Sequence, residues 1–145
     1  MRLGLLFAVL LSSLVACGQV EPVIVAVSMP ECTSSNVRSM REGRLSLSLT
    51  LNGIAHSGVA VAELIEDHSY DELQEHVATG SDVWERRPEW LRVRAELELS
   101  SAQGLDGVEE TVYVESGDYA IVCLDHDTPS GTRMRVESPL RVRAG

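Results

Sequence analysis

A cysteine and a histidine lie three positions apart near the end of the chain. They are Cys123 and His126, in the stretch GDYAIVCLDHD that covers residues 117–127. A thiolate and an imidazole are ligands of copper, but a cysteine outside the cytoplasm is equally suited to a disulfide. The other side chains that bear on this choice are His56, Met134 and Cys32. The first question is therefore whether Cys123 binds a metal or is bridged.

The N-terminal segment predicts export and a lipid anchor. It reads MRLGLLFAVLLSSLVACGQ, with one positive charge at Arg2 and an apolar run too short for a stable membrane span. Residues 14–17, LVAC, resemble the bacterial lipobox, which implies a signal peptide over 1–16 and a lipid on Cys17. An ordinary secretory signal is the alternative. We expect an extracytoplasmic protein anchored to the bacterial membrane, and Gly18 favours the outer membrane, facing the periplasm, in a Gram-negative cell.

The composition indicates one acidic domain. The chain of 145 residues has 12 basic and 22 acidic residues, a net charge of −10, and loss of Arg2 with the signal peptide leaves 11 − 22 = −11. An acidic surface disfavours nucleic acid as a partner. We expect a short tether over 17–22 and a single domain over 23–145, which is long enough to build a hydrophobic core.

Seven segments of the domain read as strands. Segments 45–51 and 91–99 alternate apolar and polar residues, which predicts strands with one face in water, whereas the apolar runs 23–27 and 58–65 predict strands covered on both sides. The remaining three segments are 111–115, 118–124 and 139–143. Turn residues separate the seven, among them Asn52-Gly53 and Gly104 to Gly107. Short strands at this spacing predict a two-sheet β-sandwich.

One helix interrupts the strands. Ser69 and Glu72 form the pattern of a capping box, Leu73 and Val77 supply an apolar stripe, and Gly80 is suited to the end of the helix. We expect about three turns between the third and fourth strands. Trp84 and Trp90 follow, and we expect them to pack over the sandwich.

The order of these elements resembles the cupredoxins, the fold family of plastocyanin and azurin, from about residue 23 to 142. The resemblance depends on NGIAH at 52–56, on the helical insertion, and on GDYAIVC at 117–123 followed by a loop and a last strand. It implies an all-β, Greek-key β-sandwich of about seven strands with one short helical insertion.

The resemblance also implies a candidate type 1 copper site. Carried over to this chain, its ligands are His56, Cys123, His126 and Met134. The Cys-x2-His spacing matches plastocyanin. However, seven residues separate His126 from Met134, more than the family usually has, and Arg133 stands where relatives often have glycine. A fixed positive charge turned toward a copper ion would be costly.

A disulfide competes for the same cysteine. If Cys17 carries the lipid, Cys32 and Cys123 remain as an even pair in an oxidising compartment. In a cupredoxin sandwich the turn after the first strand lies at the same end as the copper loop, so the bridge is plausible. It would close a loop of about 90 residues, worth about 4 to 5 kcal/mol in the chain-entropy model, and would deny copper its thiolate. We favour the disulfide.

Two functions follow from this choice. The first is a non-enzymatic, cofactor-free module for binding or envelope structure, held on the membrane by Cys17, with an unidentified protein partner. The alternative is a tethered type 1 copper protein for electron transfer or copper handling. A hydrolase is a distant third, because His56 and Ser57 are adjacent but no G-x-S-x-G elbow is present.

Overall fold

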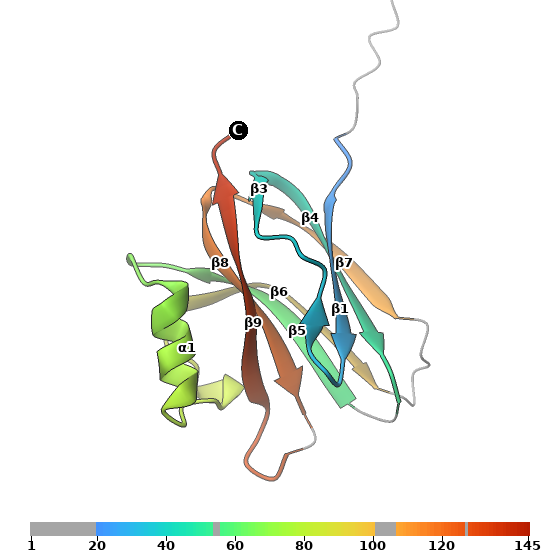
Figure 1. The fold of residues 1–145 in the computed structure, drawn as a ribbon, viewed down its shortest axis with the longest axis vertical. Coiled ribbons are helices and arrows are strands. Elements are labelled where there is room, and N and C mark those ends of the chain that lie inside the picture. The colour runs from blue at the N-terminus through green and yellow to red at the C-terminus, as the bar shows by residue number, and fades with distance from the viewer. Residues whose placement is uncertain (1–19, 54–55, 101–106, 127) are drawn as a thin grey trace, which may run out of the picture.

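Two β-sheets packed face to face form the domain (Figure 1), in a computed structural model that describes residues 20–53, 56–100, 107–126 and 128–145. The four-stranded sheet has the order β2 (Thr33–Ser34), β1 (Val23–Met29), β4 (Gly43–Leu51) and β7 (Val108–Val114). The five-stranded sheet has the order β3 (Ser39–Arg41), β9 (Arg133–Arg143), β8 (Gly117–Asp125), β5 (His56–Leu64) and β6 (Leu91–Ser100). The pairs β1 with β4 and β3 with β9 are parallel, and the other pairs are antiparallel. The expected all-β sandwich with one helical insertion is confirmed.

The main core lies between the sheets. Strand β4 contributes four leucines at alternate positions, with exposures between 0% and 3%: Leu45, Leu47, Leu49 and Leu51. Strand β1 contributes Val25, Val27 and Met29, whereas Ile24 remains 56% exposed. The prediction that segment 23–27 is covered on both sides is therefore wrong. Buried and exposed residues alternate along this segment in the usual way, but the sequence does not reveal it because the exposed residues are also apolar.

The outer face of the five-stranded sheet is covered by a second apolar cluster. Strand β5 is buried on both faces, as its apolar run predicted: Val59 and Val61 face the other sheet, and Ala60 and Ala62 face outward. The small alanine side chains leave room for Leu73 of α1 (Tyr70–Ala78) and for Trp84 of the 3-10 helix η1 (Trp84–Arg86). This arrangement confirms that Trp84 packs over the sandwich.

The helix α1 begins at the predicted capping box. The Ser69 side chain accepts a hydrogen bond from the Glu72 backbone N–H at 3.2 Å, and the Glu72 carboxylate accepts one from the Ser69 backbone N–H at 2.6 Å. The hydrogen bond from the Ser69 backbone lowers the pKa of Glu72, because it stabilises the ionised carboxylate. Gly80 follows the C-cap with a positive φ of 90°, as expected at the end of a helix.

All seven predicted strands are present in the predicted order, but the structure has nine strands and differs from the prediction in two ways. The segment 139–143 is only the second half of β9, which begins at Arg133. The short strands β2 and β3 were not predicted, because two or three residues carry no measurable periodicity and owe their pairing to β1 and β9. Residues 1–19, which include the predicted signal peptide and Cys17, lie outside the described residues, as does most of the turn predicted at 104–107. Within the part of the chain that is described, no helix is long and apolar enough to cross a bilayer.

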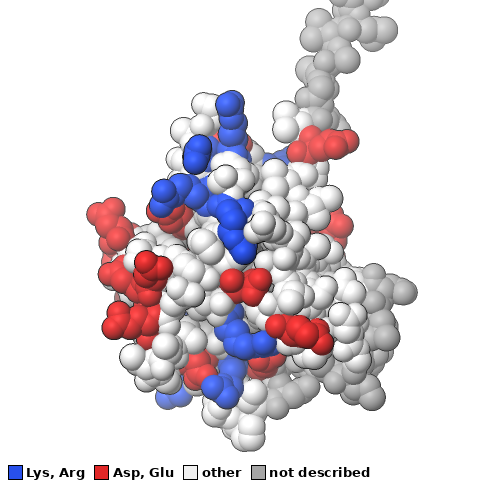
Figure 2. Space-filling model, in the orientation of Figure 1, with Lys and Arg blue, Asp and Glu red and all other residues white. Residues whose placement is uncertain are grey.

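On the face that Figure 2 shows, basic side chains gather in the upper half and acidic side chains along the left edge, and the two kinds lie together lower down. Arg141 pairs with Asp118 at 2.8 Å, and Arg135 pairs with Asp125 at 3.0 Å. Arg133 donates from Nε to Asp82 at 2.7 Å. Three of the arginines of β9 are therefore paired with carboxylates of neighbouring segments.

Loss of the capping box should destabilise α1 measurably. We expect Ser69→Ala to lower the free energy of unfolding by about 1 kcal/mol, because the Glu72 N–H loses its acceptor. Urea denaturation followed by circular dichroism measures this change. The exposed Ser116→Ala is the matched control and should change the free energy by less than about 0.5 kcal/mol. Equal effects of the two substitutions would contradict the assignment.

Candidate functional site

Cys123 of β8 and His126, the residue that follows β8, lie on opposite sides of the sheet. Cys123 pairs with Val59 and faces the core between the sheets. Leu124, the next residue, pairs with Gly58 and faces outward. His126 lies on that outer face as well, because its Nε2 is the nearest side-chain atom to the position of a Cβ on Gly58. At the Cys-x2-His spacing, Cys123 therefore lies in the core and His126 lies on the outer face of the sheet.

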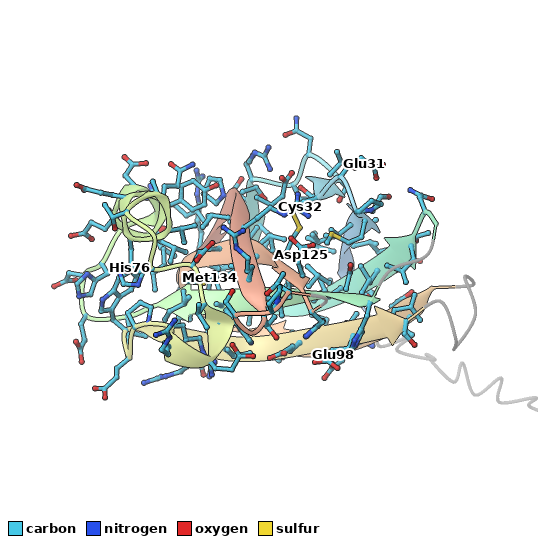
Figure 3. All side chains as sticks on the ribbon, turned by 90° about the horizontal axis from the view of Figure 1, so that it is seen from below. Glu31, Cys32, His76, Glu98, Asp125 and Met134 are labelled. Carbon is cyan, nitrogen blue, oxygen red and sulfur yellow. A yellow bond between two sulfur atoms is a disulfide. The ribbon has the colours of Figure 1, made fainter. Side chains whose placement is uncertain are left out.

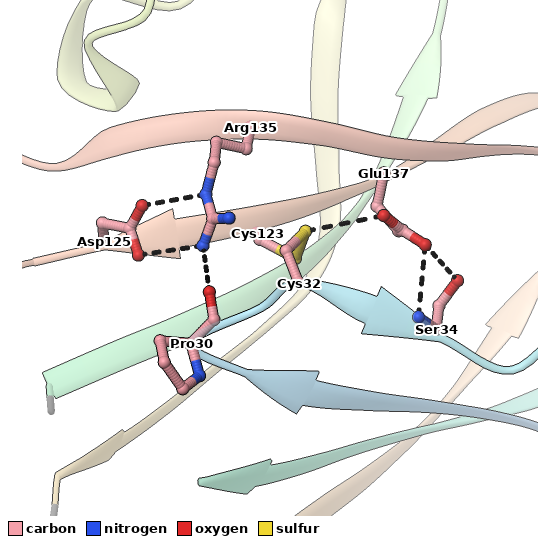
Figure 4. The surroundings of a disulfide bond; sticks show 7 residues. All are labelled: Pro30, Cys32, Ser34, Cys123, Asp125, Arg135 and Glu137. Carbon is pink, nitrogen blue, oxygen red and sulfur yellow. Dashed lines mark hydrogen bonds and ion pairs between the residues drawn. A yellow bond between two sulfur atoms is a disulfide. The ribbon is translucent and has the colours of Figure 1, made fainter. Parts of the chain in front are cut away.

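On the inner face, Cys123 is bridged to Cys32 (Figure 4). The two Cα atoms are 5.9 Å apart, a usual separation for a disulfide, and the residues are 0% and 7% exposed. Cys32 lies in the turn between β1 and β2, so the bond joins the four-stranded sheet to the five-stranded sheet. The pairing favoured from the cysteine count is the one that the structure contains.

Polar contacts from β9 hold the same turn on both sides of the disulfide (Figure 4). Arg135 donates to the Pro30 carbonyl at 2.7 Å and makes a bidentate pair with Asp125, at 3.0 and 3.2 Å. Glu137 accepts from the Ser34 backbone N–H at 3.2 Å and from its hydroxyl at 3.0 Å. The turn around Cys32 is thus fixed to the five-stranded sheet by a covalent bond and by three hydrogen bonds.

On the outer face, the two histidines lie against each other. The rings of His56 and His126 are stacked, with centroids 4.4 Å apart and an interplanar angle of 23°. The His126 backbone N–H donates to the His56 carbonyl at 3.2 Å, which extends the pairing of β5 and β8 beyond the strand ends. The side chain of His126 is 10% exposed and that of His56 is 42% exposed. One ring is therefore nearly buried and the other opens to solvent.

Glu98 of β6 completes this cluster, and its position is labelled in Figure 3. Its carboxylate oxygens lie 3.4 Å from His126 Nε2 and 3.7 Å from His56 Nε2. The register explains the meeting, because Glu98 is paired with Gly58 across β5 and β6 and therefore shares its outward face. One potential ligand atom from each of the three residues lies within 4.8 Å of the other two.

Gly58 and Thr132 set the position of His126. A Cβ at residue 58 would lie 3.0 Å from His126 Nε2 and 2.7 Å from the Leu97 carbonyl oxygen, so only glycine lets the imidazole rest against β5. On the far side of the ring, Nδ1 lies 3.1 Å from the Thr132 hydroxyl. Thr132 is itself held, because its backbone N–H donates to both Glu85 carboxylate oxygens at 3.2 Å. The imidazole thus has a fixed orientation, with Nε2 toward Glu98.

The four residues of the type 1 copper reading do not form one ligand set in this disulfide-bonded structure. His56 and His126 meet, but the sulfur of Cys123 is bonded to Cys32 on the opposite face of the sheet. Met134 shares the outer face, where it is 1% exposed in the apolar cluster that includes Leu124 and Trp84. Without a thiolate beside the imidazoles, the residues present do not fit a type 1 centre. Arg133, which raised doubt about the loop, points outward to Asp82.

Sequence reasoning missed two members of the outer cluster. Glu98 belongs to an alternating strand and reads as one of several solvent-facing acids, and only the register of β6 against β5 places it beside the histidines. Thr132 lies in the loop before β9, where the sequence has no periodicity or motif that would single it out. The single available signal was Gly58 inside an otherwise apolar strand, since such a glycine often marks a close approach of another group.

Comparison with known proteins gives likeness in structure alone. No family model matches the chain, and no curated protein matches it in sequence. An auracyanin from Roseiflexus castenholzii, in its dithionite-reduced form, is 10% identical, with a TM-score of 0.46, over 86% of this chain and 98% of that one. Auracyanin A from Chloroflexus aurantiacus, a "blue" copper protein, is 15% identical, with a TM-score of 0.48, over 85% of this chain and 100% of that one. The likeness concerns the fold, and the copper belongs to auracyanin A.

Removal of the disulfide should cost much of the stability of the domain. The bond closes a loop with a sequence separation of 91 residues, so we expect Cys32→Ala with Cys123→Ala to lower the free energy of unfolding by about 4 kcal/mol. Guanidinium unfolding of the oxidised and doubly substituted proteins measures the difference. A reducing agent should destabilise the parent protein and leave the double variant unchanged. A difference below about 1 kcal/mol would contradict a structural role for the bond.

Proposed function

We propose that this protein is an extracytoplasmic, lipid-anchored, cupredoxin-like module that acts without catalysis, in binding or in the structure of the cell envelope. The observation that supports this function best is the bond between Cys32 and Cys123. A bridged sulfur has no thiolate with which to bind copper. The domain thus keeps a sandwich of this kind while its central cysteine is used to join the sheets.

The residues around the disulfide support the same function. Cys123 is fully buried, and the polar groups that flank the bond, Arg135 and Glu137, are engaged with the β1–β2 turn. Exchange with a small thiol would require access to a sulfur that the core covers. A buried disulfide of this kind stays oxidised in an oxidising compartment. The acidic composition also disfavours nucleic acid as a partner.

A second candidate, the type 1 copper protein, is favoured by one observation. His56 and His126, the two imidazole ligands that the resemblance implies, lie next to each other at the end of β8. For that function the bond to Cys32 would have to be reduced and Cys123 would have to turn to the outer face. Both changes would disturb the core packing of β8.

A thiol count and a visible spectrum distinguish the two functions. The full chain with Cys17→Ser, produced with its leader and purified in detergent, retains only Cys32 and Cys123. We expect no free thiol under denaturing conditions and no intense blue band after addition of Cu(II). The matched control is the same chain with Cys32→Ala, which frees Cys123. Two free thiols together with a blue band that Cys123→Ala abolishes would overturn the non-copper function.

The lipid anchor has a test of its own. Cells that express the chain and are fed a radiolabelled fatty acid should incorporate the label into the wild-type protein, because Cys17 is the predicted acceptor. Cys17→Ser should abolish the labelling, and Cys32→Ala, which leaves Cys17 in place, should retain it. Label that persists in Cys17→Ser would refute the assignment of the anchor.

A further inference from the structure

We propose that His56, Glu98 and His126 form a binding site for a divalent transition-metal ion of the zinc class, on the outer face of the five-stranded sheet. The site contains no sulfur and lies on the side of β8 opposite to the disulfide. The inference rests on the proposed function in one respect, since it takes Cys123 to be bridged. It names the ligand that such a module would bind.

The spacing of the donor atoms fits a single ion. Ligand atoms about 2.1 Å from a tetrahedral zinc ion lie about 3.4 Å from one another. In this structure Glu98 lies 3.4 Å from His126 Nε2 and 3.7 Å from His56 Nε2. The two contacts are made by different carboxylate oxygens, Oε1 and Oε2, and one potential ligand atom from each of the three residues lies within 4.8 Å of the other two. To share an ion with His126, the His56 ring has to turn out of its stacked position, and its 42% exposed side chain has room to do so on the solvent side.

His126 carries the strongest evidence for a ligand. Its side chain is nine-tenths buried, and its Nε2 is buried without a hydrogen-bond partner in the described part of the chain. When Nδ1 donates to the Thr132 hydroxyl, the lone pair of Nε2 points at a carboxylate oxygen 3.4 Å away. Two acceptors that face each other at this distance repel, and a cation between them satisfies both. The Thr132 contact is the outer-shell bond that metal-binding histidines usually make.

The donor set selects the class of ion. Two imidazoles and one carboxylate are the protein ligands of many zinc sites that leave a fourth position open to water. Calcium and magnesium prefer shells made of oxygen alone, and Cu(I) prefers sulfur. Zinc therefore fits best, and Cu(II), which also takes imidazole, should bind without the blue colour of a thiolate complex. The exposure of His56 and Glu98, 42% and 51%, provides an entry path from solvent.

Titration calorimetry with zinc chloride tests the site, again on the full chain with Cys17→Ser. We expect one equivalent of Zn²⁺ to bind and to raise the thermal unfolding temperature, and no heat with Mg²⁺ or Ca²⁺. Glu98→Gln, His56→Gln and His126→Gln should each lower the affinity at least about tenfold. Thr132→Val should lower it about tenfold through the orientation of the His126 ring.

Two matched controls separate the site from nonspecific binding. His68→Gln removes a histidine that stacks on Trp90, and Glu110→Gln removes an exposed acid on β7. Both should retain the parent affinity. Because His126 is buried, its variant is tested for folding by circular dichroism, and the exposed His56 and Glu98 variants carry the conclusion if it unfolds.

The outcomes are distinct from those that test the proposed function. No zinc binding by a folded chain, or equal weakening by the control substitutions, would overturn the metal site and leave the disulfide-bonded module intact. A blue copper band would overturn the module and leave the zinc titration to be judged alone. Zinc binding that the three site variants abolish, in a chain with no free thiol, supports both.

Discussion

The disulfide between Cys32 and Cys123 is the constraint on which the rest of this structure depends. It is a covalent cross-link between the two sheets, and it ties the β1–β2 turn to the middle of the domain. The hydrogen bonds of Arg135 and Glu137 to the same turn would be weak if that segment were free to move, since exposed polar contacts contribute little on their own. With the turn fixed, they become part of one connected unit.

The period of two along a β-strand separates two kinds of chemistry on β8. Cys123 lies in the core between the sheets, whereas Leu124 lies in the apolar cluster on the outer face and His126 lies beside Glu98 on that face. In the sequence, the cysteine and the histidine have the spacing of two metal ligands. In the folded chain the odd difference of three residues is what keeps them apart, and the histidine finds its neighbours on β5 and β6 instead.

Features that depend on a few consecutive residues could be predicted from the sequence, whereas features that depend on the pairing of distant strands could not. The leucines of β4 and the Ser69 capping box were predictable, because an alternation or a cap is complete within a few residues. Segment 23–27 misled, because Ile24 is apolar and exposed. The cysteine pairing followed from a count, but the cluster of His56, Glu98 and His126 depends on the register of three strands, which local patterns do not encode.

Register also gives the buried bridge a role beyond the entropy of loop closure. A slip of β8 by one residue against β5 would turn over every side chain of the strand, so the buried Tyr119 would turn outward, Asp118 would turn toward the core, and Cys123 would turn away from Cys32. A covalent bond to Cys32 forbids that slip. The bond therefore also helps to fix the opposite face of the sheet, because the register of β8 determines that His126 lies against Gly58.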